Sequence, residues 1–198
     1  MLSTKCIFTL LQSYNQALFT LINSRLSNPF FDWLMPMLRY SNNWVILYIL
    51  LLYLCYRKLK LTTWLWLLFA IITITLSDVI SSAVVKNIYD TMRPCQDNSL
   101  LIPVRMLLTR CPSSGGFTSS HATNHFAISI FFSSTLCAYY KYTKWLYVWA
   151  ACICYAQVYV GVHYPGDVLG GMLLGLSIGY ITATVYQYIF TTFRLHTV

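Results

Sequence analysis

The 198-residue sequence contains no glutamate, and its five acidic residues are all aspartates. Charged residues make up only 9% of the chain, against about 25% in soluble domains, whereas hydrophobic residues make up 58%. This scarcity of charge excludes an ordinary soluble globular protein and indicates a single membrane-embedded domain of helices over residues 1–198. We expect no cleaved signal peptide, because the N-terminal apolar run contains polar residues and lacks a small-residue cleavage site.

The seven cysteines form neither a CxxC pair nor the Cys/His spacing of a zinc site. Five of them lie in apolar runs, where a buried structural thiol is the favoured interpretation. Cys95 and Cys111 differ, because they flank one polar loop. A disulfide between them requires an oxidising compartment, so it depends on the side of the membrane that this loop faces.

The net charge of +8 raises nucleic acid as a partner. However, the 13 Lys and Arg residues are scattered between apolar runs and form no stripe. Membrane topology and phosphate binding explain them better, and we expect no nucleic-acid partner.

Apolar runs of helical length dominate the chain. Four are clear, at about 43–57, 62–85, 121–140 and 144–162, and a fifth begins after Pro165 and extends to about residue 190. A spanning helix needs about 20 apolar residues. The sequence therefore predicts an all-α integral membrane helical bundle.

Two N-terminal segments leave the number of spans open. Residues 5–24 are less apolar and either span the membrane or lie in its interface. Residues 28–41 are interrupted by proline, and Trp33 suits an interfacial segment. The prediction is therefore five or six transmembrane helices.

The order of the crossings places the long loop 86–120 and the turn around His163 on one membrane face, because two intervening helices leave that face and return to it. Arg39 is assigned to the same face. The opposite face receives the short basic loops RKLK (57–60) and KYTK (141–144). Short basic loops mark the cytoplasmic side, so the long loop is expected to be external.

Two polar clusters on the external face have the composition of an anion site. Lys86 ends one spanning helix, Arg93 follows seven residues later, and Ser119 and Ser120 open the next helix. Arg makes bidentate contacts to phosphate oxygens, Lys acts as a point charge, and a helix N-terminus favours negative charge. We interpret these residues as a phosphate site, although a lysine at a helix end can also be only an interfacial anchor.

A third cluster supplies reactive groups beside this site. His121 follows the two serines, and the stretch YVGVHYPGDVLGG carries His163 with Asp167 four residues later. Imidazoles act as nucleophiles and general acids, and a carboxylate can hold one ring proton and leave the other nitrogen free to attack. The alternatives are interfacial histidines and a carboxylate favoured in a first helical turn. Convergence of the clusters on one face favours catalysis.

The segment HATNH places His121 and His125 at the spacing of a metal pair. The glutamate of the HExxH motif is missing, and no third ligand is evident. We therefore expect no metal and no cofactor.

The three clusters together resemble the type 2 phosphatidic acid phosphatase (PAP2) superfamily, also called the lipid phosphate phosphatases. Its pattern reads K-x6-R-P, then P-S-G-H, then S-R-x5-H-x3-D. The matching residues are Lys86, Arg93, Pro94, Ser119, His121, His163 and Asp167. The departures are Thr118, Ser120, Ala156 and Gln157, which stand where the family has Pro, Gly, Ser and Arg. The resemblance covers roughly 62–185, including the helix order, and is strongest to small bacterial members that read SSHA and carry two loop cysteines.

The resemblance implies metal-independent hydrolysis of a lipid phosphate or diphosphate through a phosphohistidine. In that mechanism His163 attacks phosphorus, Asp167 orients it, and His121 protonates the leaving oxygen and later activates water. The residues expected at the phosphate oxygens are Lys86, Arg93, Ser119, Ser120 and Gln157. The candidate substrates are undecaprenyl diphosphate, lipid A phosphate and phosphatidylglycerol phosphate, at the outer face of a bacterial cytoplasmic (inner) membrane.

Gln157 removes one cation from the family pattern. An arginine there would add a third positive charge to the phosphate, and a lost charge-assisted contact costs about 1.5–3 kcal/mol. Arg105 or Arg110 of the loop is a candidate replacement. With the loop external, Cys95 and Cys111 can pair, and we predict a disulfide that tethers the catalytic loop.

Two other functions are compatible with the sequence. A lipid phosphotransferase would pass the same phosphoryl group to a hydroxyl other than water, and a non-catalytic PAP2-like membrane protein would use the bundle alone. The oligomeric state stays open.

Two further patterns are interpreted as structural. Asp78 lies among serines in LSDVISSA, which favours a polar contact between helices. Gly171, Gly175 and Gly179 recur every four residues, a spacing that lets membrane helices pack closely. Packing within the bundle is favoured over a dimer contact.

Overall fold

The computed structural model describes residues 4–195, and all the regular secondary structure in that range is helical. The all-α prediction is confirmed. The α-helices are α1 (Thr4–Thr20), α2 (Pro29–Arg39), α3 (Val45–Leu59), α4 (Thr63–Val79), α5 (Lys86–Ile88), α6 (Ser120–Leu136), α7 (Trp145–Tyr159) and α8 (Pro165–Leu195). π-helical turns follow α1 (Leu21–Arg25) and α4 (Ile80–Val85).

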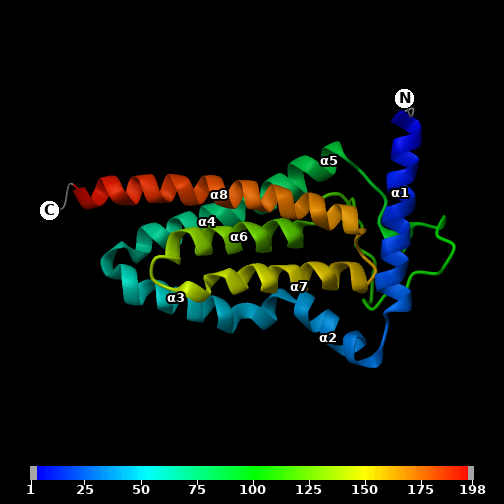
Figure 1. The fold of residues 1–198 in the computed structure, drawn as a ribbon, viewed down its shortest axis with the longest axis horizontal. Coiled ribbons are helices and arrows are strands. Elements are labelled where there is room, and N and C mark those ends of the chain that lie inside the picture. The colour runs from blue at the N-terminus through cyan, green and yellow to red at the C-terminus, as the bar shows by residue number, and fades with distance from the viewer. Residues whose placement is uncertain (1–3, 196–198) are drawn as a thin grey trace.

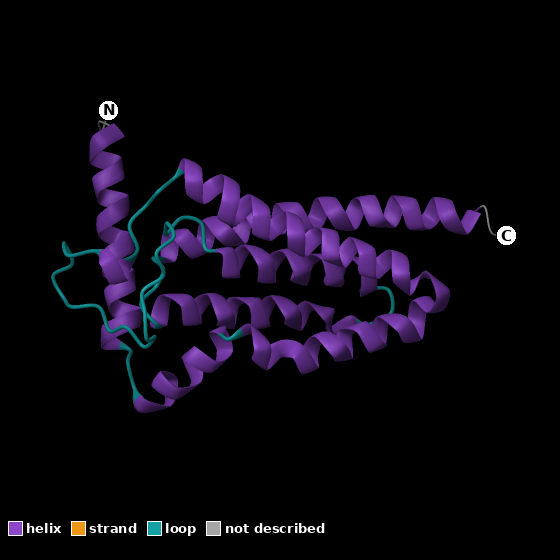
Figure 2. Cartoon of the chain, turned by 180° about the vertical axis from the view of Figure 1, so that it is seen from behind, coloured by secondary structure: helices purple, strands orange, loops and turns teal. Residues whose placement is uncertain are grey.

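Helices α3, α4, α6, α7 and α8 form a bundle. Helix α6 lies at its centre, in contact with α4, α7 and α8 (Figures 1 and 2). Helix α6 buries small and apolar side chains of its own, among them Ala122, Phe126, Ala127 and Phe131. Two helical runs are long and apolar enough to cross a membrane, Ser41–Ile88 and Pro165–Thr192. The first of these runs contains α3 and α4, which fold back on each other in Figure 1.

The glycines at every fourth position of α8 face α6. A Cβ atom at Gly175 or Gly179 would meet the carbonyl oxygen of Thr123 or Ala127, and one at Gly171 would meet that of Ser119. Without side chains at these positions the two backbones approach closely. The interpretation of packing within the bundle is confirmed, and the close approach brings the N-termini of α6 and α8 together.

A polar contact also joins α4 to α6. The Nδ2 group of Asn124 donates to Oδ1 of Asp78 at 3.0 Å, and Oγ of Ser77 donates to Oδ1 of Asn124 at 2.8 Å. The interpretation of Asp78 as part of a contact between helices is confirmed.

Helix α1 lies across one end of the bundle, at a steep angle to the other long helices (Figure 1). Oδ1 of Asn15 accepts a hydrogen bond of 2.8 Å from the backbone N–H of Gly166, and the ring of Phe19 contacts that of Tyr164 edge to face. These contacts place α1 over the start of α8. Leu10 and Leu11 on this helix are exposed.

Hydrogen bonds at Asp32 hold helix α2 against α7. The Tyr159 hydroxyl donates to Oδ1 of Asp32 at 2.7 Å, and Nη2 of Arg105 donates to Oδ2 of the same carboxylate at 2.8 Å. The backbone of Arg105 is held in turn by the side chain of buried Asn23, which also donates to the carbonyl of Tyr159. One network therefore joins α2, α7 and the long loop.

Candidate active site

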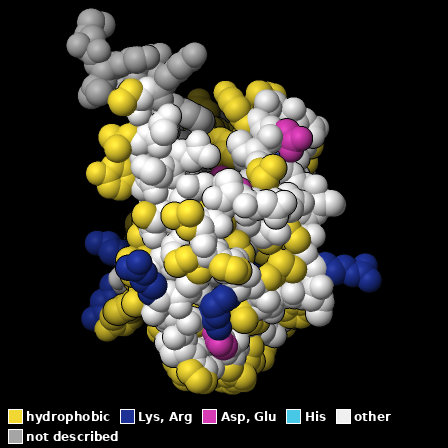
Figure 3. Space-filling view, turned by 90° about the vertical axis from the view of Figure 1, so that its right-hand side faces the viewer, with side chains coloured by type: hydrophobic (Ala, Val, Ile, Leu, Met, Phe, Trp, Pro, Cys, Tyr) yellow, Lys and Arg dark blue, Asp and Glu magenta, His cyan; other side chains and the backbone are white. Residues whose placement is uncertain are grey.

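The expected catalytic and phosphate-binding residues gather at the end of the bundle that α1 crosses. They come from the start of α5, the loop between α5 and α6, the first turn of α6, the buried end of α7, and the turn before α8 with the first turn of α8 (Figure 1). The surface at this end carries Lys and Arg side chains that stand apart from one another (Figure 3).

His163 and Asp167 lie on either side of the turn that begins α8. His163 is 3% exposed, and its Nδ1 lies 3.4 Å from Oδ2 of Asp167. This separation is longer than a normal hydrogen bond, so the contact is a loose one. Oδ2 of Asp167 also accepts from the backbone N–H of Tyr164 at 2.9 Å. Pro165 opens the helix with the fixed φ that suits a first helical position, which returns the carboxylate toward the imidazole.

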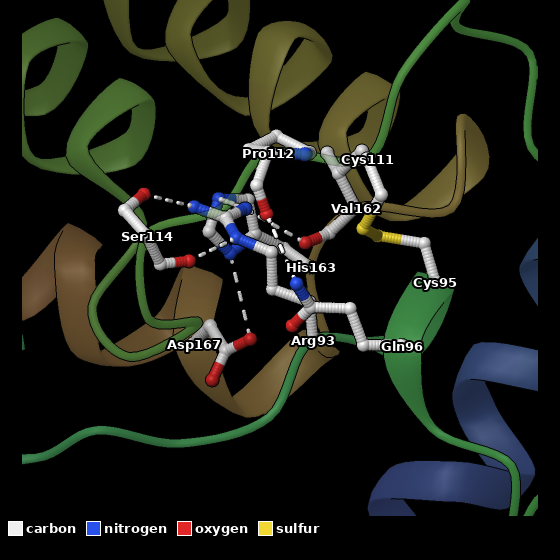
Figure 4. The surroundings of a disulfide bond; sticks show 9 residues. All are labelled: Arg93, Cys95, Gln96, Cys111, Pro112, Ser114, Val162, His163 and Asp167. Carbon is white, nitrogen blue, oxygen red and sulfur yellow. Dashed lines mark hydrogen bonds and ion pairs between the residues drawn. A yellow bond between two sulfur atoms is a disulfide. The ribbon is translucent and has the colours of Figure 1, made fainter.

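Arg93 connects the loop to this histidine (Figure 4). Its Nε and Nη2 donate to the carbonyl and hydroxyl oxygens of Ser114 at 2.7 and 3.1 Å, and its Nη1 donates to the carbonyl of Val162 at 3.0 Å. Nη1 also lies 3.0 Å from Nε2 of His163. Three directional contacts hold the guanidinium in a single orientation against the ring.

The contact with Arg93 assigns the tautomer of His163. A guanidinium has only donors, so Nε2 must accept, and the proton of the neutral ring lies on Nδ1, which faces Asp167. Burial lowers the pKa of His163 to about 4, the charge of Arg93 acts in the same direction, and Asp167 opposes the shift. The ring is therefore neutral near pH 7, with its Nε2 lone pair directed away from the carboxylate.

The first turn of α6 completes this part of the site. Ser119 is the N-cap, and its backbone N–H donates to the carbonyl oxygen of Asp167 at 3.0 Å, which ties the two helix starts together. Its Oγ lies 3.5 Å from the N–H of Ala122, at the limit of a hydrogen bond. The buried hydroxyls of Thr118 and Ser120 have no hydrogen-bond partner among the described residues. His121 follows within the same turn.

Lys86 lies at the end of the π-turn that follows α4, half-buried. Its charge interacts with those of Arg93, Asp78 and Asp167. The structure therefore brings Lys86 into the electrostatic range of the cluster without a direct hydrogen bond to it among the described residues.

Gln157 is fully buried on α7 and contacts Arg39, an arginine that no sequence motif places in the site. Nε of Arg39, the last residue of α2, donates to Oε1 of Gln157 at 3.0 Å. Neither suggested replacement contacts Gln157 among the described residues: Arg105 is paired with Asp32, and Arg110 is exposed on the loop. The order of the membrane crossings assigns Arg39 to this face. However, no local sequence pattern links Arg39 to Gln157, which lies 118 positions further along the chain.

A disulfide joins Cys95 to Cys111, with 6.0 Å between their Cα atoms (Figure 4). It lies next to the contact of Arg93 with Ser114, so the covalent bridge and the guanidinium close the same loop. Nε2 of Gln96 adds a hydrogen bond of 3.3 Å to the carbonyl of Pro112 across this loop.

A cavity of about 710 Å³ opens between α1 and the start of α8 and reaches Asp167. Its walls mix amide and apolar side chains of α1 with Thr91, Met92 and Leu169. An amphiphilic molecule could therefore approach the carboxylate from this side. Within residues 4–195, no three His, Cys, Asp or Glu side chains group as metal ligands.

Comparison with known proteins connects this geometry to a family. The family model of the PAP2 superfamily matches residues 63–191. A lipid A 4'-phosphatase of Bacteroides thetaiotaomicron is 30% identical over 154 residues, which are 75% of this chain and 66% of that protein, just under two thirds. A lipid A 4'-phosphatase of Porphyromonas gingivalis is 27% identical over 173 residues, 86% of this chain and 72% of that protein.

Two solved structures are similar. The crystal structure of LpxE from Aquifex aeolicus has a TM-score of 0.65 and 27% identity, and the match covers 86% of this chain and 95% of that one. A transmembrane PAP2-type phosphatidylglycerolphosphate phosphatase from Bacillus subtilis has a TM-score of 0.65 over 91% of this chain and 88% of that one. At 22% identity the second likeness shows the fold alone.

The fold and these matches are those of a phosphoric monoester hydrolase built in a helical membrane bundle. Because the family model matches more than half of its length, the chain belongs to the PAP2 superfamily. The resemblance stated from the motifs is confirmed.

Proposed function

We propose that this protein removes a phosphate group from a lipid phosphate through a phosphohistidine on His163, without a metal or cofactor. The observation that carries the proposal is the orientation of the buried ring. Nδ1–H faces Asp167, and the lone pair of Nε2 meets only a donor, the guanidinium of Arg93. A nucleophile in this state needs no deprotonation before it attacks.

The first step would form a bond from Nε2 of His163 to phosphorus and break the bond from phosphorus to the lipid oxygen. His121 would give a proton to that oxygen as the general acid and would then take a proton from the attacking water as the general base. Water would displace Nε2 from phosphorus, which releases inorganic phosphate and restores the lone pair. Asp167 would stabilise the positive ring that forms in between.

The phosphate oxygens would be held by the cations and free donors at this end of the bundle. Arg93 is placed for this, because the phosphate must approach the ring nitrogen that its Nη1 now contacts. The remaining donors are Lys86, the N-terminal turn of α6 with Ser119, and the unpartnered hydroxyl of Ser120. Preorganised donors around a developing negative charge supply a large share of catalysis.

The substrate class that we favour is a phosphorylated lipid A. Two similar proteins are named lipid A 4'-phosphatases, and together they align with most of this chain. Undecaprenyl diphosphate and phosphatidylglycerol phosphate are the alternatives, and they form the other arms of the experiment below.

For the topology, we propose five spans with α1 in the interface and the site at the periplasmic side of the inner membrane. The steep angle of α1 to the bundle and its exposed leucines suit an interfacial helix. The disulfide supports an external loop, since disulfides persist in oxidising compartments. If the native protein in its membrane carried free, alkylatable thiols at Cys95 and Cys111, this orientation would be wrong.

The test is phosphate release by the purified protein in detergent micelles from the three lipid phosphates, with and without a chelator. We expect release from lipid A phosphate to be the fastest, unaffected by chelator and abolished in His163→Ala. Quenching in alkaline denaturant during turnover should trap a base-stable phosphoprotein that loses its phosphate in acid, which is typical of phosphohistidine. Undiminished release in His163→Ala would refute the mechanism. Formation of a phosphorylated alcohol in place of inorganic phosphate, when an acceptor alcohol is added, would identify a phosphotransferase.

A further inference from the structure

Arg39 is a half-buried guanidinium without an acidic partner. Among residues 4–195 its one hydrogen bond is from Nε to the amide oxygen of Gln157, and no carboxylate lies within ion-pair distance. Its Nη1 and Nη2 have no partner in the described part of the chain. Burial lowers the pKa of Arg39, which reflects the cost of holding this charge away from water.

Other positive groups surround it. The charge of Arg39 acts on both Arg93 and His121, the charge of Arg93 acts on Lys86, and the charge of Lys86 acts on His121. The carboxylate that faces this group from the start of α8 is Asp167. Asp78 acts on Lys86 as well, so three cations against two nearby carboxylates leave a net positive charge in a partly desolvated site. Such an arrangement is unfavourable alone and is stabilised by a bound dianion.

The position of Arg39 is fixed by its helix. Met35 of α2 packs with Ala156 and Tyr159 of α7, and Asp32 binds the hydroxyl of Tyr159. These contacts hold the first turn and the middle of α2 against the buried end of α7. The packing of α2 against α7 therefore places Arg39 next to Gln157.

Gln157 has the chemistry of a group that orients a guanidinium. Its Oε1 accepts from Nε of Arg39, which leaves both terminal Nη groups of the fork for another ligand. Its own Nε2 is buried without a partner in the described residues. An arginine at position 157 could not accept this hydrogen bond, because a guanidinium has no acceptor.

We propose that Arg39 is the third cation of the phosphate site and that Gln157 is the residue that positions it. The inference rests on the proposed phosphatase function. The PAP2 pattern has an arginine at position 157 on α7. In this protein the positive charge comes instead from Arg39 on α2, and Gln157 supplies the hydrogen-bond acceptor that orients it. The ligand of the free Nη groups is a phosphate oxygen of the lipid substrate.

The first test compares Arg39→Gln with the wild type in kcat/KM for the best lipid phosphate and in the inhibition constant of inorganic phosphate. Loss of a charge-assisted contact predicts a decrease in kcat/KM of about 10- to 100-fold and weaker inhibition by phosphate. Arg39→Lys keeps the charge without the fork and should fall between the two. The matched control is Arg57→Gln, which removes an exposed charge at the end of α3, on the opposite face, and should leave both quantities unchanged.

The second test exchanges the pair. Gln157→Arg alone should reduce activity and the unfolding temperature, because it sets a second guanidinium against Arg39 in a buried contact. The double variant Arg39→Gln with Gln157→Arg should be more active than either single variant. If the losses of the two single variants simply multiplied in the double variant, the two positions would not serve one cation site, and the inference would fail.

The outcomes separate this inference from the function it rests on. If the wild type released phosphate from none of the three lipids, the proposed function would fail before Arg39 was considered. If the wild type was active and Arg39→Gln matched it in kcat/KM and in phosphate inhibition, Arg39 would have no part in phosphate binding. Unfolding temperatures of all variants show whether a loss reflects the site or the fold, and the double variant gives a second measurement if Arg39→Gln is unstable.

Discussion

Nη1 of Arg93 lies 3.0 Å from Nε2 of His163, on the side of the ring that faces away from Asp167. A guanidinium cannot accept a hydrogen bond, so this contact keeps Nε2 unprotonated. The same nitrogen must meet phosphorus in the proposed reaction, and Arg93 must then turn its donor toward a phosphate oxygen. One residue thus prepares the nucleophile and is placed to bind the group that the nucleophile attacks.

Arg93→Lys tests this double role. Lysine keeps a charge but loses the fork that now contacts Ser114, Val162 and His163, so we expect kcat/KM to fall by at least about 100-fold. Ser114→Ala removes only the hydroxyl contact of Nη2 and should cost about 2- to 10-fold. Kinetics on a lipid phosphate check both values. Equal activity of Arg93→Lys and the wild type would contradict the role of the fork.

Asp167→Asn tests the orientation of the ring. The amide keeps the shape of the carboxylate but gives up its charge, so it no longer stabilises the positive ring of an intermediate. We expect kcat to decrease by at least about 100-fold with a smaller change in KM, because the loss arises after binding. A change in KM alone would assign Asp167 to binding instead.

The acid limb of the activity profile should report on His163. Its pKa in the folded protein is about 4, below the value of about 6.5 for an unfolded chain. Activity that depends on the neutral ring should therefore persist below pH 6 and decrease as the pH falls toward 4. A kcat/KM profile with an acid limb near 6.5 would contradict this expectation.

The same shift affects stability. Between about pH 6.5 and 4 the unfolded chain binds the proton that folded His163 excludes, so its contribution to stability is complete above about 6.5 and is lost as the pH falls through about 4. His163→Gln should flatten this part of the curve of unfolding temperature against pH. Buffers matched in ionic strength keep other charge effects constant.

The sequence predicted what depends on local pattern and spacing. Apolar run lengths predicted the helices, a four-residue glycine repeat predicted the close packing of α8 on α6, and the i, i+4 spacing placed Asp167 beside His163. Arg39 could not be found in this way. Its place beside Gln157 depends on how α2 packs against α7, which no periodicity of either segment expresses.

The position of α1 was also beyond the sequence. Its hydropathy allowed both a span and an interfacial helix, and its place is set by distant contacts of Asn15 with Gly166 and of Phe19 with Tyr164. Arg105 shows the same limit. From the sequence, Arg105 was a candidate for phosphate binding because it is a cation in the long loop. In the structure its guanidinium donates to the carboxylate of Asp32, 73 residues away.

Gly175→Ala tests whether helix packing sets the geometry of the site from a distance. The added methyl group would meet the backbone carbonyl of Thr123, which cannot turn aside as a side chain can, so α8 must shift away from α6. Overpacking of this kind costs about 1–3 kcal/mol and should lower the unfolding temperature by several degrees. The shift would also strain the hydrogen bond of 3.0 Å from the N–H of Ser119 to the carbonyl oxygen of Asp167, which joins the two helix starts.

We therefore expect Gly175→Ala to have a lower kcat/KM and a lower stability than the wild type, although Gly175 lies outside the proposed substrate site. Ser177→Ala is the matched control, because Ser177 is an exposed residue two positions further along the same helix and bonds only to the preceding turn. It should leave activity and unfolding temperature unchanged. If Gly175→Ala lost stability but kept full activity, the site would be held by the loop, through Arg93 and the disulfide, and the packing of α8 on α6 would serve stability alone.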